Sequence, residues 1–109
     1  MSTRVIRYRT HPDRADENQR LIEGVFAELA ERRPEGVRYA SVRSADGSFV
    51  HIVTVDVEPN PLLALASFAR FQEGIGERCA EPPVALDVTV VGSYGIDLTG
   101  EGAPAGRTG

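Results

Sequence analysis

The sequence predicts an α+β protein in which four antiparallel strands form one sheet and two helices cover one of its faces. Two observations carry this prediction. A strand–helix–strand pattern from about Arg4 to Ser44 is repeated from about Gly47 to Ile96. The Asp46-Gly47 pair between the halves is a strong hairpin signal, because its turn requires positive φ angles. Two such units joined by a hairpin give the order β-α-β-β-α-β.

The first half begins with an alternating, β-rich segment from Arg4 to Thr10, which predicts a strand. Asp13 is a good helix N-cap, and apolar residues at three- and four-residue spacing predict a helix that extends to about Arg33. Pro34 then ends this helix. The segment from Gly36 to Ser44 is the second strand, and it leads into the hairpin.

The second half begins with a strand from Phe49 to Val55 that is apolar at nearly every position. A strand that is apolar on both faces must be covered on both faces. The Asn60-Pro61 pair predicts a second helix, with Asn as the cap and Pro at the first helical position. We expect this helix to extend to about Arg78.

The fourth strand is expected from Val84 to Tyr94, because the Pro82-Pro83 pair prevents the helix from continuing. The segment from Asp97 to Gly109 is rich in Gly, Thr and Pro and contains few large apolar residues, which predicts a disordered tail. The sequence therefore predicts one domain over residues 1–96, followed by a tail over residues 97–109.

Right-handed crossovers place the first and third strands at the centre of the sheet and both helices on one face, which is the ferredoxin-like arrangement. Two helices cover only one face of the sheet. Because the third strand is apolar on both sides, we expect a second copy of the chain to cover the other face. The sequence therefore predicts a homodimer.

Composition narrows the classes of function. The net charge of −4 argues against nucleic-acid binding, which favours a basic surface. One cysteine, no signal-peptide pattern and no apolar run near 20 residues favour a cytoplasmic protein that does not enter a membrane. No His/Cys/carboxylate cluster has the spacing of metal ligands and no Gly-rich loop opens a helix, so we expect neither metal nor cofactor.

The element order, the HPDRADEN segment at residues 11–18, the hairpin and the length together resemble the dimeric α+β barrel superfamily. Within it the chain is similar to the antibiotic-biosynthesis monooxygenase-like proteins, and the resemblance covers roughly Arg4 to Tyr94. It implies that two sheets face each other in a barrel, with pockets between each sheet and its helices or inside the barrel. Cofactor-independent oxygenases of polycyclic aromatics are among the activities that the resemblance implies.

His51 is the candidate catalytic residue, because it interrupts the apolar third strand. A neutral imidazole there could act as a general base or orient a ligand. The alternative is a buried His whose nitrogens are satisfied by a Tyr or a backbone carbonyl.

Five further residues are candidates for ligand binding. Arg7 could bind a carboxylate or phenolate, or pair with an acidic residue at the rim. Tyr8, Tyr39 and Tyr94 lie on three predicted strands and could donate hydrogen bonds to a ligand, or simply pack as aromatic residues. Asn18 could face a pocket between helix and sheet, or lie in solvent.

Two hypotheses about function remain open at the sequence level, and with them whether the protein is an enzyme. In the first, the dimer binds a small, partly apolar metabolite and acts as a cofactor-independent monooxygenase-like enzyme, with His51 as base or orienter. In the second, the dimer is non-catalytic, has no enclosed ligand site, and its polar residues satisfy one another.

Overall fold

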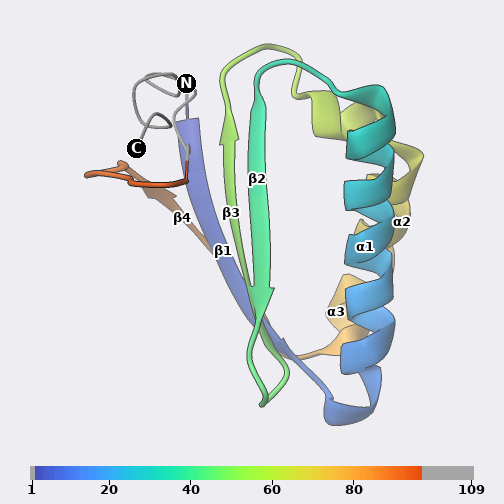
Figure 1. Cartoon of the computed structure of the whole chain (residues 1–109). Helices are drawn as coiled ribbons and strands as arrows, with labels where there is room; N and C mark the ends of the chain where they lie inside the picture. Colours follow the sequence, from blue (N-terminus) through green and yellow to red (C-terminus); the bar gives the residue numbers. More distant parts are fainter. Residues whose placement is uncertain (1, 97–109) are drawn as a thin grey trace.

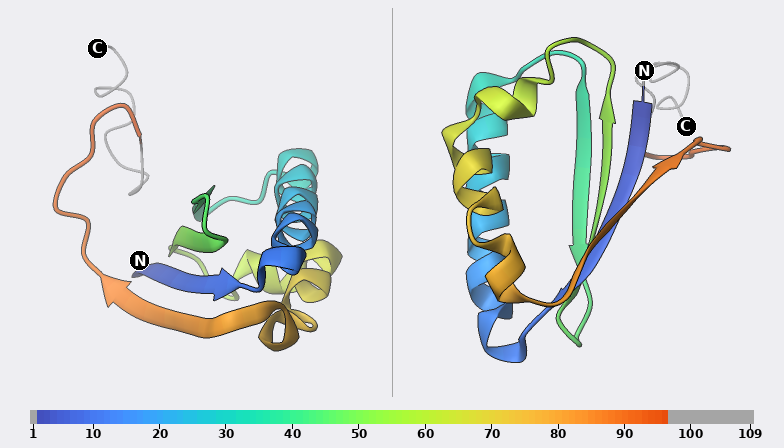
Figure 2. Two further views of the ribbon diagram at one scale, coloured as in Figure 1. Left: turned by 90° about the horizontal axis from the view of Figure 1, so that it is seen from below. Right: turned by 180° about the vertical axis from the view of Figure 1, so that it is seen from behind.

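The protein forms one antiparallel sheet with its helices on one side. The structure, a computed structural model, describes residues 2–96. The strands are β1 (Ser2–Thr10), β2 (Val37–Arg43), β3 (Ser48–Val55) and β4 (Cys79–Val88). Their order is β2-β3-β1-β4, and all three neighbouring pairs are antiparallel. The helices lie together on one face of the sheet (Figures 1 and 2). The predicted ferredoxin-like α+β fold is thus confirmed, and the predicted tail at 97–109 lies outside the described residues.

The helical layer contains one long helix and several short ones. They are the 3-10 turn η1 (Pro12–Arg14), α1 (Ala15–Arg32), the 3-10 turn η2 (Pro61–Ala64), α2 (Ala66–Gln72) and α3 (Ile75–Arg78). The prediction of Asp13 as the N-cap of the first helix was wrong. Asp13 lies within η1, and α1 begins only after Arg14, which makes no side-chain cap bond.

The second helical segment was predicted as one continuous helix, and this was wrong. Asn60 does cap its start, with a side-chain oxygen that accepts from the Leu62 amide at 2.9 Å. However, Leu65 adopts an extended conformation between η2 and α2, and Glu73 does so after α2. Gly74 follows with a φ of 75°, which a glycine adopts without steric cost. The chain therefore turns twice, and the second turn places α3 directly before β4.

The fourth strand was predicted at Val84–Tyr94 but is found at Cys79–Val88. Pro82-Pro83 was interpreted as a stop between helix and strand. The two prolines instead lie inside β4, which is an edge strand, where a missing N–H need not cost a sheet hydrogen bond. The pairing of β4 with β1 is also irregular near Arg9. Tyr94 therefore follows the sheet rather than lying in it.

The hairpin between β2 and β3 turns where predicted, but over residues 44–47 and with positive φ at Gly47 and not at Asp46. Gly47 has a φ of 86°, and the Asp46 carboxylate accepts a hydrogen bond from the Ser48 amide at 2.9 Å. This turn sets the register in which Ser41 pairs with His51 and Tyr39 with Val53. Register matters here because paired residues share a face, and the helix-facing side therefore receives His51 and Tyr39 together.

The two faces of the sheet differ sharply in what covers them. On the helix side eight buried residues of the sheet and the helical layer form one core cluster: Tyr8, Ala15, Ile22, Val25, Phe49, Leu62, Leu65 and Phe71. The opposite face is also apolar and only partly covered, since Thr3 and Thr54 are buried on it at 7% and 1% exposure. There Val42 is 61% exposed and Leu86 is 56% exposed.

Candidate functional site

A buried polar cluster centred on His51 lies between the sheet and the helices. His51 is in the middle of β3, paired with Ile6 of β1, and its side chain is 2% exposed. The Tyr8 hydroxyl lies 2.8 Å from His51 Nε2, and the Tyr39 hydroxyl lies 2.9 Å from His51 Nδ1. Both ring nitrogens are therefore occupied, by tyrosines from the strands on either side of β3.

Asn18 of α1 and Arg78 of α3 extend this cluster into the helical layer. Asn18 Nδ2 donates to the Tyr8 hydroxyl at 2.9 Å, and Arg78 Nε donates to Asn18 Oδ1 at 2.9 Å. The Arg78 guanidinium also donates to the backbone carbonyls of Phe71 and Glu73. Asn18 is fully buried and Arg78 is 2% exposed. We call these five residues, Tyr39, His51, Tyr8, Asn18 and Arg78, the His51 network.

The His51 network is neutral apart from Arg78 at pH 7. Burial lowers the pKa of the His51 imidazole to about 4, because a charged ring would lose its hydration there. Burial raises the pKa of the Tyr8 hydroxyl to about 12, opposed by the hydrogen bond from Asn18 and the charge of Arg78. Burial likewise raises the pKa of Tyr39. Both tyrosines thus remain hydrogen-bond donors over the physiological range.

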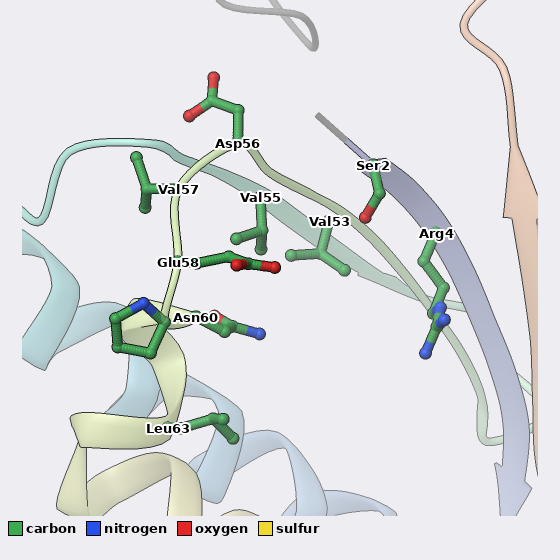
Figure 3. A pocket seen from close by; sticks show the side chains of 10 residues that line it. Ser2, Arg4, Val53, Val55, Asp56, Val57, Glu58, Asn60 and Leu63 are labelled. Atoms are coloured by element: carbon green, nitrogen blue, oxygen red, sulfur yellow. The ribbon is translucent and has the colours of Figure 1, made fainter.

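A wide cavity of about 1020 Å³ lies beyond the His51 network, at the end of the sheet where β3 leads into η2. Its apolar wall contains Val53, Val55 and Leu63, and Leu63 is 69% exposed to the open space. Glu58 and Asn60 extend into the cavity from the loop after β3 (Figure 3). Five of the ten lining residues are polar or charged, namely Ser2, Arg4, Asp56, Glu58 and Asn60, so the cavity combines an apolar wall with a polar side.

The polar groups of the cavity include donors on Arg4 and Asn60 and two carboxylates, Asp56 and Glu58. Arg4 lies on the opposite side of the cavity from the loop and forms an ion pair with Asp87, with an N–O distance of 3.0 Å. Asn60 uses its oxygen for the η2 cap, which leaves its amide hydrogens available. Within residues 2–96 no hydrogen bond or ion pair involves the Glu58 carboxylate.

The cavity and the His51 network are neighbours on one face of the sheet. Val53, which lines the cavity, is two residues from His51 and is the cross-strand partner of Tyr39. His51 itself is not among the lining residues. A ligand in the cavity would therefore lie beside the network rather than on the imidazole.

The structure brings four of the six predicted site residues together, namely His51, Tyr8, Tyr39 and Asn18. Arg7 pairs with Val50 and Val84 on the other face of the sheet, so it cannot reach His51. Tyr94 is 88% exposed, beyond the end of β4. The predicted placement of Tyr94 on a strand was wrong, because β4 begins and ends earlier than expected.

Arg78 was missed by the sequence analysis. An Arg at the end of a predicted helix normally indicates a favourable interaction with the helix dipole. Nothing in the sequence shows that the chain turns at Gly74 and carries this side chain inward. Across residues 2–96 no group of His, Cys, Asp and Glu could hold a metal ion, and no helix is long and apolar enough to cross a membrane.

Comparison with known proteins rests on the structure alone, since no family model and no curated protein matches the chain. A provisionally named antibiotic biosynthesis monooxygenase from Bacteroides thetaiotaomicron has a TM-score of 0.72 and 17% identity, with 88% of this chain and 93% of that chain covered. A protein of the same provisional name from Nitrosomonas europaea has a TM-score of 0.68 and 13% identity, with 83% and 89% covered.

A variant of SnoaB, a cofactor-independent oxygenase from Streptomyces nogalater, has a TM-score of 0.61 and 21% identity, with 84% and 94% covered. These similarities define the class of fold: a ferredoxin-like α+β protein with a four-stranded antiparallel sheet. More narrowly, the chain has the fold of the antibiotic biosynthesis monooxygenase-like proteins, as its sequence predicted. At these identities the comparisons establish the fold and not the reaction.

Proposed function

We propose that the protein binds a small, partly apolar metabolite in the cavity beside the His51 network and acts on it as a cofactor-independent monooxygenase-like enzyme. The cavity carries this proposal. Its volume of about 1020 Å³ exceeds what a single bicyclic molecule requires, and Leu63 presents an exposed apolar surface to it. A bound ligand would remove that surface from water.

The polar groups of the cavity indicate the kind of ligand. Arg4 and the Asn60 amide can donate to a carbonyl, hydroxyl or anionic oxygen, while Glu58 can accept from a hydroxyl. A flat molecule with oxygen atoms at its edge and an apolar body would satisfy both kinds of contact. Phenols and enolisable carbonyl compounds have this form.

Oxygenation without a cofactor requires that the substrate supply the electrons. For 1-naphthol, reaction with one O₂ gives 1,4-naphthoquinone and one water: one oxygen atom enters the ring and the other leaves as water. The protein must bind an electron-rich anion and hold its oxygen with donors. In this proposal His51 acts as an orienting group that does not contact the ligand, since it does not line the cavity. The fold that the chain shares with SnoaB supports the proposal by analogy.

The test is calorimetric titration of the protein with 1-naphthol, followed by measurement of oxygen uptake. We expect binding in the wild type and weaker binding in Leu63→Arg, which replaces the exposed apolar wall of the cavity with a charged side chain. Ala64→Arg is the matched control, since Ala64 is exposed in the same turn but does not line the cavity. Naphthoquinone formation without added cofactor would support the oxygenase step. Equal binding by both variants would contradict the cavity assignment.

A second candidate function, a non-catalytic dimer, is favoured by the apolar side chains that are exposed on the face of the sheet opposite the helices. Val42 of β2 and Val84 and Leu86 of β4 expose large apolar side chains on this face, which also carries Arg7. We propose that a second copy covers this face in either case, which should bury at least about 1,000 Å² in total. Absence of binding by any phenol, with an intact dimer, would leave this candidate as the better account.

A further inference from the structure

The chain after β4 carries apolar side chains that its own fold leaves exposed. We call residues 89–96, which form neither helix nor strand, the arm. In the arm Val91 is 99% exposed, Tyr94 88% and Ile96 64%. The arm projects from the end of β4 on the side of the sheet away from the helices (Figures 1 and 2). Single exposed apolar residues are ordinary, but three of them in one short projecting segment indicate a surface that another chain covers.

The other edge of the sheet is free and has an apolar groove beside it. β2 pairs with β3 on one side and, within residues 2–96, with no strand on the other. Such an edge presents backbone N–H and C=O groups with which a further strand can pair. Beside it lies a groove of about 330 Å³, which we call the edge groove, lined by Phe26 and Leu29 of α1 and by Val37 and Tyr39 of β2. An added strand gains affinity from its backbone and specificity from a side chain in such a groove.

The arm matches this edge in length and in pattern. Its eight residues reach about 26 Å when extended, at about 3.3 Å per residue, and the seven residues of β2 reach about 23 Å. Tyr94 and Ile96 fall on one face of an extended strand and Val91 falls on the other. Because an enclosed tyrosine ring buries about 150–250 Å², Tyr94 is the side chain of the arm best suited to fill the edge groove.

Within one chain the arm and the edge groove lie at opposite edges of the sheet. The strand order is β2-β3-β1-β4, and three strand spacings of about 4.8 Å place β2 about 14 Å from β4. A second copy can supply the missing contact to both partners, because each copy has one arm and one free edge. Reciprocal exchange about a two-fold axis uses both arms and both edges and closes the assembly. The arm also leaves the sheet on the side where Val42 and Leu86 are exposed, so the two contacts fit one dimer.

We propose that the arm of one copy adds as a strand to the free edge of β2 in a second copy, that Tyr94 occupies the edge groove there, and that the second copy returns the same contact. The arm is thus an interaction surface whose partner is this chain itself. The inference extends the dimer proposed above from contact between two sheet faces to an exchange of arms. It does not depend on whether the cavity binds a metabolite, so the two proposals fail separately.

Cross-linking between two differently tagged copies tests where the arm lies. The single native cysteine is first removed by Cys79→Ser. One copy then carries Ser93→Cys in the arm, beside Tyr94, and the other carries Ala30→Cys, which lines the edge groove. A short bismaleimide should join these two copies covalently, and it should give little product when Asp13→Cys, exposed in η1 at the other end of α1, replaces Ala30→Cys. Equal yields from the two pairs, or no covalent heterodimer, would overturn the inference.

Sedimentation equilibrium tests the role of Tyr94 in the contact. Tyr94→Ser should raise the dissociation constant of the dimer by at least about tenfold, because an aromatic anchor leaves the interface. Tyr94→Phe is the matched control, since it keeps the ring and should dimerise as the wild type does. Neither change should alter the folding of the single chain, in which Tyr94 is exposed. A dimer that is unaffected by Tyr94→Ser would overturn the exchange of arms and leave the contact between sheet faces, and a monomeric wild type would overturn both.

Discussion

Mild acid should destabilise the protein through His51 before its carboxylates titrate. The pKa of His51 is about 4 in the folded protein because of burial, against about 6.5 in an unfolded chain. Between these values the unfolded chain binds a proton that the folded protein does not. The contribution of the neutral His51 is therefore complete above about pH 6.5 and is lost progressively as the pH falls from about 6.5 to about 4, below which no further loss occurs. At about 1.4 kcal/mol per pH unit, the loss is on the order of 3 kcal/mol.

Urea unfolding at several pH values between 7.5 and 4.5 measures this loss. His51→Gln is the informative variant, because its amide can both donate and accept between the two tyrosines but does not titrate. Its free energy of unfolding should be lower at pH 7.5 yet nearly constant down to pH 5. His11→Gln should behave as the wild type, since His11 is exposed.

Carboxylates do not obscure the measurement. Hydrogen bonds from Arg14 lower the pKa of Glu17, and those from Ser67 lower the pKa of Glu28. Their contributions are present above the unfolded value near 4.3 and are lost only below it. A wild-type free energy that stays constant between pH 7 and 5, or that falls equally in His51→Gln, would refute the burial of a neutral His51.

Three other substitutions test separate parts of the structure. Arg78→Met should cost about 3 kcal/mol or more in urea unfolding, because the buried Asn18 and the backbone carbonyls of Phe71 and Glu73 lose their donor; a loss below about 1 kcal/mol would contradict the packing of α3. Gly36→Ala should cost about 2 kcal/mol, since Gly36 has a φ of 83° and an added Cβ would lie 2.6 Å from a methyl group of Val57; a neutral result would show a different turn. Val42→Arg should shift sedimentation at micromolar concentration from dimer to monomer, and a folded wild-type monomer would refute the proposed interface.

The fold could be predicted because its signals are local. Alternation in β1, the Asp46-Gly47 turn and the Asn60-Pro61 helix start each depend on a few adjacent residues, and all three occur in the structure. The second helical segment failed because helix propensity does not reveal an extended Leu65. The prolines of β4 were misread because their meaning depends on whether the strand lies at the edge of the sheet.

The candidate site was predictable in part for a related reason. A lone His within an apolar strand, with tyrosines on other strands, indicates a buried polar cluster, and His51, Tyr8 and Tyr39 do meet. Which face each strand residue occupies depends on register, so the separation of Arg7 from His51 was not visible in the sequence. Arg78 enters the cluster only through the turn at Gly74, a tertiary feature.

The central claim is that a small metabolite occupies the cavity beside the His51 network. A crystal structure of the protein grown with 1-naphthol tests it most directly. We predict electron density for the ring over Val53 and Leu63, with the hydroxyl group within hydrogen-bonding distance of Asn60 or Arg4. A well-ordered crystal in which naphthol is absent from this cavity at saturating concentration, or is found only on the open face of the sheet, would contradict the account.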